Sequence, residues 1–234
     1  MYESIGPDRF ELISVAQDSG GPSAINKWYD KAKPTYRCVV DPTHEVSSLF
    51  GWVNVPSAAW IDEDGQIVRS NEGVYPSEVS IGFGLGKVRA GDDSFAQATR
   101  DWIERGADSE HVWSSRELAE RLKPVDDDKL LAEATFKLAL HFEAVGDSER
   151  ALKHFAAAED LAPDNWNYVR QGWTHKGTVY ASWKILKRTA DLRKNTDKSF
   201  YDPTGLPGEN YRRITETEWL WTPALQRIKK LFRG

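Results

Sequence analysis

Short apolar runs separated by turn residues occupy the first third of the chain, and this pattern predicts alternating strands and helices. The run from Phe10 to Ala16 ends at the turn-prone "DSGGP" and is expected to form a buried strand. A helix with Ser23 near its start should follow, and then a second strand in "YRCVVDP". The segment "THEVSSLFG" predicts a short helix closed by Gly51, since glycine is favoured just after a helix.

The stretch "VNVPSAAWIDEDGQIVR" predicts a β-hairpin. Ser57 to Ile61 should form one strand, "DEDG" holds an Asp-Gly turn, and Gln66 to Arg69 should form the return strand. A helix is expected after it, over 94–105. Pro56 stands at the entry to the first strand although proline has no N–H to donate. The pattern alone favours a trans proline at a strand's first residue, which is allowed.

The order β–α–β–α–β–β–α resembles the thioredoxin fold, in particular its TlpA/ResA-like redoxin branch. The resemblance rests on "FELISVAQD" as the second core strand, "VVDPTHEVSSLFGW" as the insertion and helix, "VNVPS" as the proline loop and "AAWIDEDGQIVR" as the terminal hairpin. It covers about residues 2 to 105. The resemblance implies that Pro56 follows a cis peptide bond, and that Val55 and Pro56 bind an extended substrate through the backbone of Val55.

The resemblance also implies a Cys-x-x-Cys, or its selenocysteine equivalent, at the start of the first core helix, and this chain has no such pair. Cys38 is its single cysteine. It lies in a predicted strand, where a small buried apolar side chain is expected; a reactive or intermolecular thiol is the alternative. No catalytic residue and no metal ligand set is therefore assigned, and no cofactor is expected.

The first core strand of the family fold, which lies between the second strand and the hairpin, is also missing. Without it, those two strands should face each other across a gap of roughly 10 Å, twice the usual spacing. We expect an incomplete fold in which another chain or segment fills the slot, or a truncated gene model that starts at an internal methionine.

The second half of the chain has helical spacing. Ser114 and Glu117 predict a capping box before a short helix over 118–122. Residues 132–165 resemble one tetratricopeptide repeat, in which Leu138, Ala139 and Phe142 belong to the first helix. Gly146 lies at its turn, and the second helix packs through Ala151, Phe155 and Ala158. A lone repeat cannot bury its own faces, so a long capping helix is expected over 166–195, with Gly172 and Gly177 as kinks.

The C-terminal "TPALQRIKKLFRG" predicts an amphipathic helix begun by Thr222 and Pro223. Docking on the body of the protein is favoured over a membrane-surface role. Residues 195–217 are polar and predict a loop. The chain has ten tryptophans, which are expected mostly in the core and between domains, with an exposed aromatic patch as the alternative.

The predicted architecture is an incomplete α/β thioredoxin-like domain (1–107), an all-α tetratricopeptide-like region (108–194), and a loop with the terminal helix (195–234). The net charge of -5 does not suggest nucleic acid as a partner, and no apolar run reaches the roughly 20 residues of a membrane span. No signal peptide is present as written, but a signal or anchor could be lost with the N-terminus, so the compartment stays unassigned.

Two functions follow from these observations. The first is a thiol-disulfide oxidoreductase of the redoxin family, inactive as given because the cysteine pair is absent, with a protein or peptide thiol or disulfide as substrate. The second is a non-catalytic protein-binding module that uses the proline loop, the aromatic helical region or both.

Overall fold

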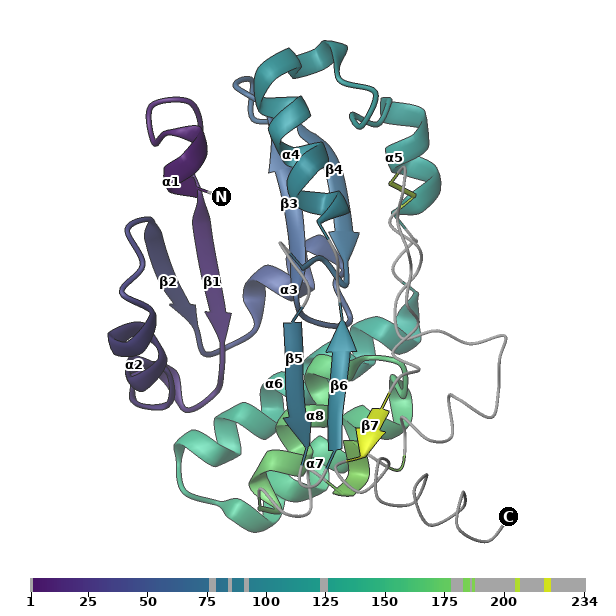
Figure 1. Ribbon diagram of the computed structural model, residues 1–234. Coiled ribbons are helices and arrows are strands. Elements are labelled where there is room, and N and C mark those ends of the chain that lie inside the picture. Colours follow the sequence, from purple (N-terminus) through teal and green to yellow (C-terminus); the bar gives the residue numbers. More distant parts are fainter. Residues whose placement is uncertain are drawn as a thin grey trace, which may run out of the picture.

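The computed structural model describes residues 2–75, 79–83, 86–90, 93–122, 126–177, 183–185, 187, 205–206 and 217–219. They form a mixed α/β structure (Figure 1). Among these residues, no helix combines the length and the apolar character that a membrane span requires.

The N-terminal part follows the predicted order of strands and helices. It comprises α1 (Tyr2–Ile5), β1 (Ile13–Gln17), α2 (Gly21–Ala32), β2 (Arg37–Asp41), α3 (Glu45–Phe50), β3 (Ser57–Ile61), β4 (Ile67–Glu72) and α4 (Ser94–Arg105). The predicted start of β1 was three residues too early, and its Ile13 is 53% exposed rather than buried. Gly51 ends α3 with φ of 67°, where its missing Cβ removes the steric penalty of the left-handed conformation.

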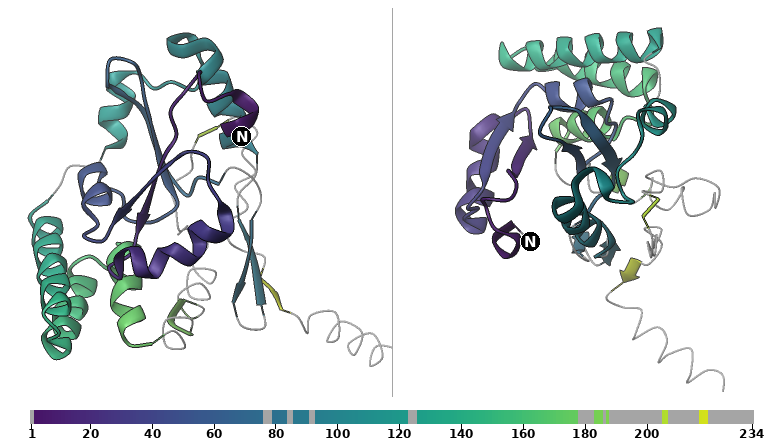
Figure 2. Two further views of the ribbon diagram at one scale, coloured as in Figure 1. Left: turned by 90° about the vertical axis from the view of Figure 1, so that its left-hand side faces the viewer. Right: turned by 90° about the horizontal axis from the view of Figure 1, so that it is seen from above.

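These strands form two separate sheets. β1 pairs with β2 in parallel, β3 pairs with β4 antiparallel, and no described strand joins the two pairs. Figures 1 and 2 show the pairs apart from each other, with the chain passing from one to the other through α3. The sequence predicted this separation, since no part of it matched the strand expected between β1 and β3, and no strand of the described residues lies there.

The β3–β4 hairpin is covered by α4. The rings of Trp60 and Trp102 stack with 4.9 Å between centroids, and Ala98 and Leu206 complete this buried cluster. Leu206 comes from the expected C-terminal segment, so that segment contributes to the α/β core.

A hairpin of β5 (Val79–Phe83) and β6 (Gly86–Ala90) follows β4, and β6 also pairs with β7 (Thr217–Trp219). These strands were not predicted, because glycines interrupt the apolar pattern and the third strand lies far away in the sequence. β6 belongs to the expected first segment and β7 to the expected last one.

The helical part contains η1 (Gly106–Asp108), α5 (Ser115–Arg121), α6 (Asp127–Ala144), α7 (Ser148–Leu161) and α8 (Trp166–His175). The capping box of Ser114 and Glu117 is present. α6 and α7 form an antiparallel hairpin, and α8 packs against α7 (Figure 2). Their core includes Ala139, Ala151, Phe155 and Ala158.

The structure corrects or refines three predictions for this region. Leu138 lies in the first helix as predicted, and its side chain is 42% exposed. Gly172 lies inside α8 without ending or kinking it, and a Cβ at that position would lie 3.0 Å from the Cβ of Phe155. Glycine therefore permits the close approach of α7 and α8. The predicted capping helix over 166–195 is interrupted: α8 ends at His175, Gly177 has φ of 107°, and residues 183–185 are helical again. The predicted terminal helix lies outside the described residues.

Candidate functional site at the proline loop

The proline loop, residues 52–56, is held to the end of β4. Glu72 Oε2 accepts hydrogen bonds from the backbone N–H groups of Val53 (3.1 Å) and Asn54 (2.7 Å). The carbonyl of Pro56 accepts from the N–H groups of Gly73 (2.7 Å) and Val74 (3.2 Å). The Val55–Pro56 peptide bond is cis, so that prediction is confirmed. The backbone groups at both ends of this loop are therefore hydrogen-bonded to the end of β4 and the residues that follow it.

Val55, one of the two predicted substrate-binding residues, is 36% exposed. Its backbone N–H is engaged, however, because it donates to Oδ1 of Asn54 at 2.9 Å. The sequence had suggested that the backbone of Val55 is available to an extended substrate. In the structure, the side chain of the preceding residue holds its N–H.

One face of α8 covers the loop. Asn167 donates from Nδ2 to the carbonyl of Trp52 (3.0 Å) and from its backbone N–H to the carbonyl of Val53 (3.2 Å). Arg170 donates from Nη2 to Oδ1 of Asn54 (2.5 Å). Gln171 donates to Oγ of Ser19, which lies in the turn after β1. The positions 167, 170 and 171 are neighbours on a helix surface, so a single helix face contacts both the loop and the end of β1.

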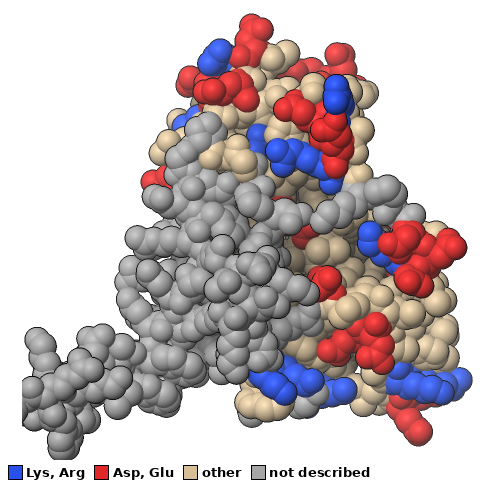
Figure 3. Space-filling view, turned by 90° about the vertical axis from the view of Figure 1, so that its right-hand side faces the viewer, with Lys and Arg blue, Asp and Glu red and all other residues tan. Residues whose placement is uncertain are grey.

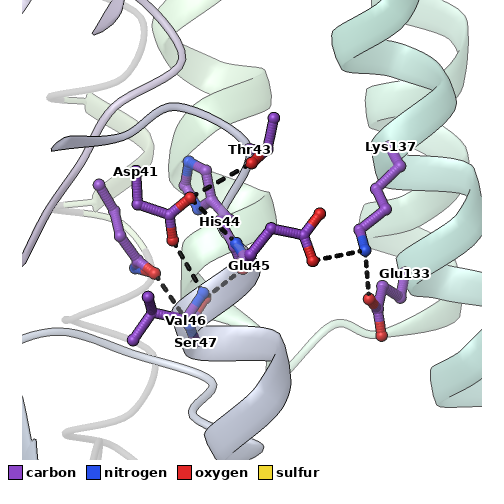
Figure 4. A network of polar contacts seen from close by, with 9 residues as sticks. Asp41, Thr43, His44, Glu45, Val46, Ser47, Glu133 and Lys137 are labelled. Carbon is purple, nitrogen blue, oxygen red and sulfur yellow. Dashed lines mark hydrogen bonds and ion pairs between the residues drawn. The ribbon is translucent and has the colours of Figure 1, made fainter. Parts of the chain in front are cut away.

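Asp41, the last residue of β2, organises the start of α3 (Figure 4). Its carboxylate accepts from the N–H groups of Glu45 (3.1 Å) and Val46 (2.9 Å) and from the hydroxyl of Thr43 (3.3 Å). These bonds satisfy N–H groups that a helix leaves without a partner in its first turn. The ends of β1 and β2 and the proline loop thus converge beneath the helical part of the chain.

An ion-pair network connects α3 with α6. Lys137 contacts Glu45 at 3.0 Å and Glu133 at 2.8 Å (Figure 4). These two carboxylates raise the pKa of Lys137 by hydrogen bonding, Glu133 having the larger effect, and partial burial works against them. The three side chains are partly exposed, so the network orients α3 more than it stabilises the fold.

His44 lies at the junction of the two parts of the molecule. It is 3% exposed, has φ of 60°, and packs its ring edge-on against Phe136 of α6. Neither ring nitrogen has a hydrogen-bond partner among the described residues. Burial lowers the pKa of this imidazole, and Arg170 lowers it further, whereas the carboxylates of Asp41 and Asp18 raise it. His44 is therefore held neutral inside the junction.

Cys38 lies in β2, away from any helix start, and its Sγ accepts a hydrogen bond from the hydroxyl of Ser14 at 3.1 Å. It is partly rather than fully buried. No group of three His, Cys, Asp or Glu side chains suited to a metal ion occurs in the part of the chain that the structure describes. The described residues therefore contain neither a cysteine pair nor a group suited to a metal ion at this edge.

Sequence reasoning did not identify Asn54, Glu72, Asn167 and Arg170 as part of this edge. The spacing of polar residues 167, 170 and 171 on a helix of aromatic side chains was a usable signal, because it marks a polar strip beside an apolar one. Nothing in the pattern, however, indicated what that strip would contact.

Comparison with known proteins yields no matching family model, no matching curated protein and no matching solved structure. On the face shown in Figure 3, the described Lys and Arg side chains are interspersed with Asp and Glu side chains. The described residues of this face therefore form no extended patch of a single charge.

Proposed function

We propose that this chain is a thioredoxin-like protein of the redoxin family whose proline loop binds an extended stretch of a protein substrate. The observation that carries the proposal is the convergence at one edge of the turn after β1, the end of β2 and the proline loop before β3. In the proposed fold, this is the edge at which substrates meet the redox cysteines. The α6–α7 hairpin is proposed as a single tetratricopeptide-like repeat that supports this edge through α8.

Thiol-disulfide exchange by this protein requires two thiols that this sequence does not supply. One thiolate attacks a substrate disulfide sulfur to give a mixed disulfide, and a second thiolate then releases the reduced substrate as the pair becomes oxidised. Cys38 is the single cysteine of the chain. We place the missing dithiol on a partner segment whose strand pairs with β1 on one side and β3 on the other.

A non-catalytic binding module is the second candidate. It is favoured by the same cysteine content, since a loop that binds an extended segment can work without redox chemistry. The redoxin and the form of the binding module that uses the proline loop both require the loop to bind a peptide. They differ in whether a dithiol segment completes the protein.

Peptide binding tests the part that the two candidates share. The probe is a fluorescein-labelled heptapeptide of β-branched residues around one S-methylated cysteine, measured by fluorescence anisotropy. Val55→Asp places a charge on the exposed loop side chain and should weaken binding at least about tenfold, because apolar contact is replaced by a hydrated carboxylate. Leu130→Asp, at an exposed apolar position on α6, is the matched control and should bind like the wild type. Equal affinity of all three proteins would refute the proposed loop function.

The DNA upstream of Met1 separates the two candidates. The gene is read upstream of Met1 for an in-frame strand followed by Cys-x-x-Cys, and disulfide reduction is measured with and without that segment. Activity gained with the segment supports the redoxin. An upstream region without such a motif, together with peptide binding, supports the binding module.

A further inference from the structure

Oδ1 of Asn54 is the meeting point of two donors from different parts of the chain. It accepts from the backbone N–H of Val55 at 2.9 Å and from Nη2 of Arg170 at 2.5 Å. Both partners can only donate, so the atom between them must be the carboxamide oxygen and not its nitrogen. The two bonds occupy the two lone pairs of this oxygen and define one orientation of the side chain.

Asn54 is itself rigidly held. It is 3% exposed, its N–H donates to Glu72 at 2.7 Å, and its carbonyl accepts from the hydroxyl of Ser57 at 2.6 Å. Backbone rotation at this residue would break these bonds. The carboxamide can therefore leave the Val55 amide only by rotation of its own side chain, and the bond to Arg170 opposes that rotation.

We propose that Asn54 is a latch over the substrate-pairing amide of Val55, and that Arg170 is the positioning residue that keeps the latch closed. This inference rests on the proposed function, because it assumes that an extended substrate pairs with the backbone of Val55. A substrate must displace the carboxamide oxygen before its own carbonyl can accept from that N–H. The affinity of the loop for a peptide is then set partly by the helical part of the chain.

Arg170 can act in this way because α8 is anchored independently of the loop. Gly172 allows α8 to approach Phe155 of α7 closely, and Nε1 of Trp173 donates to Glu159 of α7 at 3.0 Å. The guanidinium is oriented by a second bond, from Nε to the carbonyl of Trp166 at 3.2 Å. A shift of α8 relative to the loop would therefore release Asn54, which couples the packing of the helices to the availability of the Val55 amide.

Four single variants of the full chain test the latch. Arg170→Ala removes the positioning donor, Arg170→Lys keeps a cationic donor, and Asn54→Ala removes the latch itself. Asn167→Ala is the matched control, because it removes a bond from the same helix to the same loop, at the carbonyl of Trp52, without touching the Val55 amide. Amide hydrogen exchange of Val55 is followed by NMR, and affinity is measured with the labelled heptapeptide described above.

Arg170→Ala should speed the exchange of the Val55 amide and tighten peptide binding, each by about tenfold. Loss of one hydrogen bond to a charged group changes an equilibrium constant by about this factor. Asn54→Ala should do so at least as strongly, and Arg170→Ala should add nothing when Asn54→Ala is already present. Arg170→Lys should restore most of the wild-type behaviour, and Asn167→Ala should leave Val55 exchange at the wild-type rate.

Unchanged Val55 exchange in Arg170→Ala would overturn the latch, as would an equal effect from Asn167→Ala. Weaker peptide binding by Arg170→Ala would also overturn it, because the residue would then support binding rather than oppose it. Faster Val55 exchange without peptide binding by any variant would support the latch and refute the proposed function, so the two failures are distinguishable.

Discussion

The helical region α6–α8 and the α/β region β1–β4 differ in how they bury apolar side chains. In the helical region, Phe136, Phe155 and Val169 are at most 1% exposed, and the buried clusters to which they belong consist of residues between Ala132 and Ile185. In the α/β region, Ile13 and Ile61 are 53% and 49% exposed, although they lie in strands. A helix satisfies its own backbone, whereas a strand depends on a neighbour for its hydrogen bonds and its cover.

This difference indicates that the two regions complete their cores in different ways. The helices form their buried cluster chiefly among themselves, since α8 packs on the hairpin of α6 and α7, and His44 adds its ring against Phe136. The strands form two pairs whose joining strand does not occur in the described chain. The α/β region therefore gains the most from any segment that pairs with β1 and β3, and the expected effects below test this contrast.

The largest effect is expected in the helical core. Phe136→Ala should lower the free energy of unfolding by about 3 to 5 kcal/mol, because it empties a site packed by Phe155 and Tyr168. Urea unfolding followed by far-ultraviolet circular dichroism measures the change. A loss below about 1 kcal/mol would show that this core is not the stable part of the molecule.

A smaller loss is expected where α7 and α8 approach each other. In Gly172→Ala the new methyl group would lie 3.0 Å from the Cβ of Phe155. Overpacking of this kind costs about 1 to 3 kcal/mol, and the higher helix propensity of alanine offsets about 1 kcal/mol of it. Urea unfolding should give a net loss, whereas Thr174→Ala, at an exposed position on the same helix, should be nearly neutral. A stabilised Gly172→Ala would disprove the close-approach role.

The junction between the two regions should be sensitive to acid through His44. Its pKa is lowered in the folded protein from 6.5, chiefly by burial, so the unfolded chain binds the proton more readily. Stability is therefore full above the unfolded value and falls as the pH drops through about 6.5 toward the folded pKa. Asp41 and Asp18 favour the proton, and Arg170 opposes it.

Urea unfolding between pH 7.5 and 5.5 measures this dependence. His44→Asn cannot titrate and tolerates the left-handed backbone at this position, so its stability should change less over the same range. The other histidines remain in both proteins, which makes the difference between the two profiles specific to His44. Parallel profiles would mean that His44 is not held neutral by burial.

The smallest effect is expected at the exposed edge of the α/β region. Ile13→Ala should cost less than about 1 kcal/mol, because the side chain is already half in water. The same variant should cost more when a segment that pairs with β1 covers this residue. A loss comparable to that of Phe136→Ala in the chain alone would remove the contrast between the two regions.

Local patterns were sufficient to predict most of the elements. The β3–β4 hairpin, the helix over 94–105 and the capping box at Ser114 follow from turn, periodicity and cap chemistry, which act within a few residues. The pairing of β6 with β7 was missed because a strand's partner can lie anywhere in the chain. The exposure of Leu138 was missed because a periodic pattern marks an apolar face without stating what covers it.

The sequence by itself determined the order of most of the elements, the proline loop at Val55 and Pro56, and the absence of a cysteine pair, since these depend on residue identity and short-range spacing. Only the tertiary structure decided that α8 would lie over that loop, that Arg170 would reach Asn54, and that Asn54 would hold the N–H of Val55. The contacts between α8 and the loop join residues more than a hundred positions apart, and their geometry depends on how every intervening element packs.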